Sequence, residues 1–177
     1  SISIPPIAGA AGSFRAVEID AQIEIGYGVA VADVNGDGKP DVLLADKRAY
    51  VWYENPTWKK HVLAERLTAL DHVCLAARDV DGDRFCEIAV GAGWNPGDTV
   101  NSGAVFSLTP AADRLGLWNS LALPHEPTVH RMRWVRNAGQ GYDLVMLPLH
   151  GRGNKTTGEG VGVRLLSYHP PAVAGRT

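Results

Sequence analysis

An internal repeat constrains the fold of this 177-residue chain more than any other feature of its sequence. The stretch at residues 28–44 recurs at residues 74–90, so that Asp79 takes the place of Asp33. A weaker third copy at residues 130–146 keeps the same outline of apolar run, turn and second apolar run. A fixed repeat of this kind is typical of proteins built from stacked or radially arranged units.

Each repeat is predicted to form four short antiparallel strands. In the first repeat, apolar runs at 29–34, 42–45, 50–53 and 59–63 are separated by turn residues. The 20 glycines and 11 prolines are spread along the chain and favour tight turns, and no stretch holds a helical apolar period over a useful length. Four strands in a unit of roughly 50 residues is the pattern of a β-propeller blade.

We therefore predict an all-β chain, residues 1–177, that forms one segment of a β-propeller with about three blades. The predicted blades span residues 26–67, 71–124 and, incompletely, 128–172, and residues 14–20 are expected to be the outer strand of a preceding blade. Closed propellers typically have about 4 to 8 blades. The segment is therefore expected to belong to a longer propeller or to be completed by association into a homo-oligomer.

The turns of the first two repeats place oxygen-bearing side chains at alternate positions. Positions 1, 3, 5 and 9 hold Asp33, Asn35, Asp37 and Asp41 in the first loop, and Asp79, Asp81, Asp83 and Glu87 in the second. Position 7, Lys39 or Phe85, can add a backbone carbonyl. Such a ligand set suits a hard cation that takes about 6 to 8 oxygens, and calcium fits best. Two calcium sites are predicted, and the third copy, which keeps only Asp143, is expected to hold none.

The acidic loops also admit two other interpretations. An EF-hand shares the opening Asp33-x-Asn35-x-Asp37, but it requires a glutamate at position 12, where this chain has Leu44 and Val90. Alternatively, Asp-Gly-rich turns can simply cap hairpins. Concentrated like charges repel one another without a cation, and their occurrence in two equivalent loops favours metal binding.

The nonapeptides DVNGDGKPD (33–41) and DVDGDRFCE (79–87) resemble the FG-GAP or VCBS repeats of calcium-binding β-propellers, including those of integrin α-subunits and of many secreted bacterial and fungal proteins. The resemblance implies a structural calcium ion that ties the hairpin of each blade. Arg84 in place of glycine and Glu87 in place of aspartate depart from the family pattern. The resemblance further implies an extracellular or periplasmic location and allows a protein-interaction role of the integrin type.

The connections predicted on the opposite rim carry most of the remaining polar chemistry. Candidate ligand-binding residues there are His125, Glu126, His150, Arg152 and Trp94, with His72, His130 and Arg131 close to them in the predicted topology. Histidine exchanges protons near neutral pH, and carboxylates and arginines beside it can orient a polyol or carbonyl. These residues predict a site for a carbohydrate or another small polar ligand, although a solvated rim of loops would have the same composition.

Two further stretches, VWYENP (51–56) and VHRM (129–132), resemble the propeller of fungal aldos-2-ulose dehydratases, which are lyases and isomerases acting on oxidised sugars. This resemblance implies His130 as general base with Arg131 nearby, and His72 is a further catalytic candidate. The sequence thus leaves three functions open: a calcium-stabilised carbohydrate-binding module, a sugar lyase or isomerase, and a protein-interaction module.

Charge and composition exclude several other classes. The formal net charge of -2 gives no general reason to expect nucleic acid as a partner. No apolar run has the length of a membrane span, and the chain starts at Ser1 without a signal-peptide pattern, so a leader could have been removed. Cys74 and Cys86 have no metal-binding or disulfide-framework spacing and are expected to be small buried hydrophobes.

Overall fold

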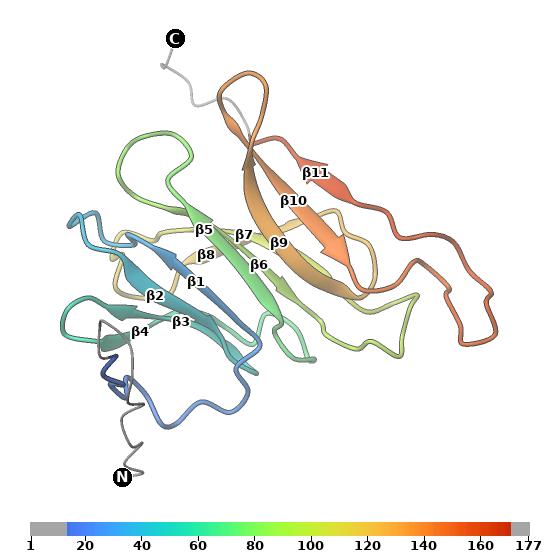
Figure 1. Ribbon diagram of the computed structural model, residues 1–177, viewed down its shortest axis with the longest axis horizontal. Coiled ribbons are helices and arrows are strands. Elements are labelled where there is room, and N and C mark those ends of the chain that lie inside the picture. Colours follow the sequence, from blue (N-terminus) through green and yellow to red (C-terminus); the bar gives the residue numbers. More distant parts are fainter. Residues whose placement is uncertain (1–13, 171–177) are drawn as a thin grey trace.

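The computed structural model describes residues 14–170, which form three antiparallel β-sheets arranged side by side (Figure 1). Two of these sheets have four strands and the third has three. The described residues contain no helix, so this part of the chain has none that is long and apolar enough to cross a membrane. The predicted all-β class, built from blade-like antiparallel sheets, is confirmed.

In every sheet, the strands follow one another in chain order, each joined to the next by a turn or loop. The first sheet consists of β1 (Gly28–Ala32), β2 (Asp41–Ala45), β3 (Ala49–Glu54) and β4 (Lys59–Glu65). The second consists of β5 (Cys74–Arg78), β6 (Glu87–Ala92), β7 (Ala104–Thr109) and β8 (Asn119–Leu123). The third consists of β9 (Val129–Arg136), β10 (Tyr142–Pro148) and β11 (Leu166–Tyr168).

Hydrophobic side chains fill the spaces between neighbouring sheets. Because alternate residues of a strand point to opposite faces, each four-stranded sheet can present one apolar set to each side. One core lies between the first and second sheets and includes Leu43, Trp52 and Ile88. A second core lies between the second and third sheets and includes Val129 and Met132. The sheets therefore pack face to face, as blades do.

Residues 14–20, expected to be an outer strand, form no strand in the structure. An outer strand needs a neighbouring strand of its own blade, and no described strand pairs with this segment. Instead, the segment lies beside the outer face of the first sheet, where Tyr53 Oη donates to Asp20 Oδ2 (2.7 Å) and Lys60 Nζ contacts the same oxygen (2.8 Å). The segment thus caps the first sheet with side-chain contacts.

Both cysteines are buried and free, as the sequence predicted. Burial raises the pKa of the Cys74 thiol to about 12 and that of the Cys86 thiol to about 12. A thiol with so high a pKa is protonated at neutral pH and unreactive as a nucleophile. The two residues therefore act as small apolar side chains within the cores.

The arrangement of the sheets places β5 between β1 and β9, so that the first strands of the three sheets are neighbours (Figure 1). The hairpin loops that leave these strands lie at one side of the molecule, toward the upper left in Figure 1. The β6–β7 and β10–β11 connections lie at the opposite side, toward the lower right. The acidic loops and the polar rim are therefore separated by the length of the strands.

Candidate metal centre and polar rim

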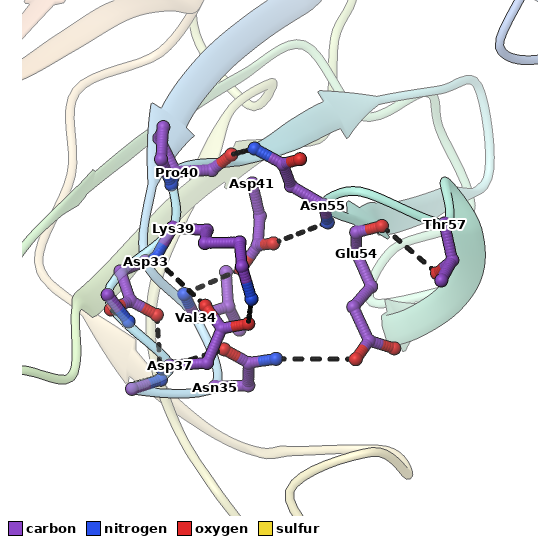
Figure 2. A network of polar contacts seen from close by, with 12 residues as sticks. Asp33, Val34, Asn35, Asp37, Lys39, Pro40, Asp41, Glu54, Asn55 and Thr57 are labelled. Carbon is purple, nitrogen blue, oxygen red and sulfur yellow. Dashed lines mark hydrogen bonds and ion pairs between the residues drawn. The ribbon is translucent and has the colours of Figure 1, made fainter.

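The first acidic loop is held by hydrogen bonds from its backbone to its own carboxylates (Figure 2). Asp33 accepts from the backbone N–H groups of Gly36 (2.7 Å) and Gly38 (2.8 Å). Asn35 Oδ1 accepts from Asp37 N (3.1 Å), and Asp37 Oδ1 accepts from Lys39 N (2.8 Å). These bonds fold the loop tightly around its own oxygen-bearing side chains.

Asp41 closes the first loop from the start of β2. Its side chain is fully buried, and its two oxygens accept from the backbone N–H groups of Val34 and Asn55, both at 2.9 Å (Figure 2). Burial raises the pKa of Asp41 despite these bonds, and the charges of Asp33 and Asp37 add to the increase. A cation beside these carboxylates would remove that penalty.

The second acidic loop repeats the hydrogen-bond pattern of the first. Asp79 accepts from the N–H groups of Gly82 (2.6 Å) and Arg84 (3.0 Å), as Asp33 does from the equivalent residues. Bonds at the positions of Asp81, Asp83 and Glu87 also match their counterparts, with distances of 3.0, 2.8 and 2.8 Å. Burial raises the pKa of Glu87, as it does for Asp41. The longer glutamate therefore performs the same closing role as the aspartate.

Three carboxylates of the second loop converge in a way that suits a metal ion. One oxygen each from Asp79, Asp81 and Glu87 lie within 4.8 Å of one another. Two ligands on opposite sides of a calcium ion, each at about 2.4 Å, are separated by about this distance. Carboxylate oxygens are also the donors that calcium prefers. The second loop therefore has the donor set and the spacing to hold a metal.

The first loop differs in how one of its carboxylates is neutralised. Lys39 Nζ forms an ion pair with Asp37 Oδ2 at 2.7 Å, and this contact lowers the pKa of Asp37 and raises that of Lys39. Asn35 supplies an amide oxygen where the second loop has the Asp81 carboxylate. The lysine is exposed and flexible, so a metal ion can displace it from the aspartate.

The two loops contact each other directly. Phe85 of the second loop covers Gly36 of the first, where an added Cβ would clash with the ring. The N–H of Cys86 donates to the carbonyl of Asp33 at 3.2 Å. Arg114 lies over the Phe85 ring, with its guanidinium carbon 4.0 Å from the centroid. The two acidic loops therefore pack against each other, so that a change in the conformation of one alters the contacts of the other.

The third hairpin loop is held by hydrogen bonds of Asn137 and lacks most of the acidic side chains of the first two loops. Asn137 Oδ1 accepts from Gly139 N (3.0 Å) and Gly141 N (3.1 Å), and its amide donates to Asp143 (2.9 Å). His169 pairs with the same carboxylate at 2.9 Å. The Asp143 carboxylate of this loop therefore has two polar partners, and that the loop holds no metal stays a prediction.

On the opposite rim, His130 stacks on Trp94 with ring centroids 5.4 Å apart and an interplanar angle of 19°. Burial lowers the pKa of His130, and the electrostatic effects of the neighbouring Arg131 and His150 side chains lower it further. The imidazole is therefore neutral at pH 7 and able to accept a proton. Three of the predicted rim residues, Trp94, His130 and His150, are thus brought together.

Glu126 is the charged anchor of this rim. Its carboxylate is almost fully buried and contacts Arg164 Nη1 (2.8 Å) and Arg152 Nε (3.4 Å). Next to it, Thr128 is buried with φ of 53°, a left-handed conformation that costs a β-branched residue free energy. Its hydroxyl donates to the carbonyl of His150 and accepts from the His150 N–H. These contacts fix the β8–β9 connection against the β10–β11 connection.

The remaining predicted site residues lie apart from this cluster. His72 is fully buried, with its ring stacked on Tyr50 at 4.4 Å, so a ligand in solution does not reach it. His125 is exposed and its Nδ1 lies 3.1 Å from the carbonyl of Glu126. Arg131 points away from the rim, into a cavity beside β1 and β5.

Two residues of the rim were not anticipated from the sequence. Arg164 lies far from Glu126 along the chain, in the long β10–β11 connection, and no local motif indicates the pairing. Thr128 looks like an ordinary polar loop residue, although its backbone conformation is unusual. Both features depend on the packing of the β10–β11 connection against the β8–β9 connection, and this packing is part of the tertiary structure.

The fold and the acidic loops together define a class of protein: a propeller-type repeat module in which neighbouring blades share equivalent acidic hairpin loops. Residues 33–90, which contain both acidic loops, match the family described as FG-GAP-like repeat. No curated protein gives a significant match to the chain. The family match supports an integrin-like β-propeller repeat module for this segment.

Proposed function

We propose that the chain is a calcium-stabilised FG-GAP-type β-propeller module that holds one ion in each of its two acidic loops. The observation that carries this proposal is the repetition of one hydrogen-bond frame in both loops, together with the convergence of three carboxylates in the second. A bound ion would supply charge neutralisation and oxygen coordination at each hairpin.

The chain's own residues would then stiffen the junction between the first two sheets. Each loop holds its ligands through backbone N–H groups, so ligand positions and loop conformation are coupled. The Cys86–Asp33 hydrogen bond and the contact of Phe85 with Gly36 join the loops to each other. Calcium in these loops would therefore resist separation of the two sheets. The role is structural rather than catalytic.

A calcium titration tests the proposal. With free calcium at 100 times its Kd, each site is expected to stabilise the protein by about 2.7 kcal/mol. That value corresponds to an increase in Tm of about 5–10 °C per site for a chain of this size. The measurement is thermal unfolding in calcium, in magnesium and in EDTA, combined with isothermal titration calorimetry for the number of sites.

Variants assign the ions to their loops. Asp81→Ala, which leaves no side-chain oxygen at this position, is expected to remove one site and Asp37→Ala to remove or weaken the other, whereas Asp113→Ala, an exposed control outside both loops, keeps both. A Tm that is the same in calcium and EDTA would refute the proposal. Unchanged stoichiometry in Asp81→Ala would refute the assignment to the second loop.

A second candidate function, binding of a carbohydrate at the polar rim, is favoured by the Trp94–His130 stack beside charged Glu126 and Arg152. Aromatic faces and bidentate polar groups are suited to sugar rings and hydroxyls. A glycan array followed by calorimetry tests it, with Trp94→Ala expected to abolish binding and Trp58→Ala, in the β3–β4 turn, to retain it. If no glycan on the array binds and a pull-down recovers a protein partner, the result would favour the protein-interaction module.

The sugar lyase or isomerase alternative rests on His130, whose lowered pKa keeps it neutral and able to remove a proton next to a carbonyl. Turnover of a 2-keto sugar that is lost in His130→Asn, at unchanged Tm, would support it. Turnover that persists in the variant would remove His130 from that role.

The proposal also includes an extracellular location and a propeller that is completed by further copies of the chain or by further chain. Light scattering at several protein concentrations tests the association of copies.

A further inference from the structure

A cavity of about 290 Å³ is lined by residues from the first strands of the three sheets, β1, β5 and β9. β5 contributes Cys74 and Leu75, and β9 contributes Arg131 and Arg133. The remaining lining comes from β1, its preceding turn and one residue of β2: Gly26, Tyr27, Gly28, Val29 and Leu44. This cavity is separate from the acidic loops and from the Trp94–His130 stack.

Arg131 and Arg133 give the cavity a concentrated positive charge. They are two residues apart on β9, so their side chains leave the same face of the strand, with Cα atoms separated by about 7 Å. In each, Nη1 donates to the backbone carbonyl of the preceding residue at 2.8 Å. These bonds steady the guanidinium groups and leave their other N–H donors available.

Neither arginine is neutralised within residues 14–170, where no carboxylate forms an ion pair with them. Other arginines in this part of the chain have clear partners: Arg152 and Arg164 contact Glu126, and Arg78 lies on the ring of Tyr142. Both arginines are exposed, so water and salt weaken their mutual repulsion, and an anion that contacts both guanidinium groups would remove what is left of it. The charges of the two arginines also act on the neighbouring Cys74 thiol. They lower its pKa, whereas burial raises it.

We propose that this cavity binds a carboxylate, held by Arg131 and Arg133, with the apolar part of the ligand against Val29, Leu44 and Leu75. Guanidinium groups bind carboxylates through paired, charge-assisted hydrogen bonds. The apolar lining favours an organic acid over inorganic phosphate, and the volume is at the lower end for ligand pockets, which suits a small acid or a single acidic side chain. The carboxylate comes from a free acid or from a partner's glutamate or aspartate.

The test uses the full chain in calcium and measures binding by isothermal titration calorimetry. The probes are benzoate, succinate and glucuronate, with benzamide, glucose and inorganic phosphate as matched neutral and ionic controls. A blocked peptide with one central glutamate represents a partner's side chain. Tighter binding of the free acids identifies a small-molecule site, and tighter binding of the peptide identifies a protein contact. Both results support recognition of a carboxylate.

Charge-removing variants connect the binding to the cavity. Arg131→Gln and Arg133→Gln are each expected to weaken carboxylate binding about tenfold or more, the loss typical of a charge-assisted hydrogen bond. Arg136→Gln, which removes the same charge from the exposed end of β9, is the control and should bind as the parent does. Val29→Trp keeps both arginines but fills the cavity, and it should also abolish binding.

Three results would overturn the proposal. The first is an absence of saturable binding by every carboxylate probe at concentrations up to about 10 mM, where a site with a Kd of about 1 mM would be nearly saturated. The second is equal affinity in the parent, Arg131→Gln and Arg133→Gln, with unchanged Tm in all three. The third is binding of phosphate in preference to every carboxylate. Because calcium is present throughout, a failed metal proposal would not produce any of these results.

Discussion

Gly38 and Arg84 occupy the same place in the two acidic loops, and we expect substitutions there to change the free energy of unfolding in opposite directions. Gly38 has φ of 82° and Arg84 has φ of 79°, so both are in the left-handed region. A residue with a Cβ pays about 1–2 kcal/mol for that conformation. Glycine avoids this cost but loses about 0.4–1 kcal/mol through the greater freedom of its unfolded chain. The net difference is about 1 kcal/mol.

Steric contacts do not complicate the experiment, because no atom lies within 4 Å of a Cβ built on Gly38. Gly38→Ala is therefore expected to destabilise the protein by about 1 kcal/mol through backbone strain alone. Arg84→Gly should be more stable than Arg84→Gln by the same amount, since both lose the charge and only glycine removes the strain. The Arg84 N–H bond to Asp79 is made by the backbone and is retained.

The assay is urea unfolding followed by tryptophan fluorescence in EDTA, which excludes effects on calcium affinity. With an m-value of about 2 kcal/mol/M, each difference moves the midpoint by about 0.5 M. Gly97→Ala is the control, since Gly97 has no positive φ and the nearest atom to its added Cβ lies at 3.4 Å. Gly38→Ala as stable as the parent, or Arg84→Gly no more stable than Arg84→Gln, would refute the reasoning.

Further expectations concern polar contacts away from the loops. Glu126→Gln should destabilise by about 1–2 kcal/mol because two arginines lose a buried partner, whereas Glu159→Gln, in an exposed pair, should cost less than about 0.5 kcal/mol in the same thermal unfolding assay. Tyr50→Phe should cost about 1 kcal/mol through loss of the bond to the Gly91 carbonyl, measured in urea. Hydrogen bonds from Lys60 and Tyr53 lower the pKa of Asp20 to about 2, below its unfolded value of 3.8, so its stabilisation is present above pH 4 and lost as the pH falls toward 2. Asp20→Asn should flatten this part of the stability profile, and a profile identical to the parent's would contradict it.

Local sequence patterns were enough to predict the hairpins and their loops. The first hairpin was expected from 29–34 and 42–45, and the structure has Gly28–Ala32 and Asp41–Ala45. The small shift arises because Asp33 already belongs to the loop, where it accepts two backbone hydrogen bonds. The residue preferences of turns and the alternation of strands act within a few residues, so hairpins can be predicted without knowledge of the rest of the fold.

Other features required contacts between distant parts of the chain. Residues 14–20 carry the same alternation as β4, yet they form no strand because no neighbouring strand pairs with them. His72 follows β4 in a connection expected on the rim, but packing against Tyr50 buries it completely. The burial of a side chain and the pairing of a strand depend on residues that are distant in the sequence, and the local sequence pattern does not identify those residues.

The sequence by itself determined the repeat, the all-β class, the antiparallel hairpins and the positions of the acidic loop residues, because each depends on residues close together along the chain. The tertiary structure alone decided that Asp79, Asp81 and Glu87 converge, that the two loops share a contact, and that Glu126 meets Arg164. It also brought Arg131 and Arg133 into one cavity with β1 and β5. Such meetings depend on how whole sheets pack face to face, and packing is a property of the assembled core rather than of any single segment.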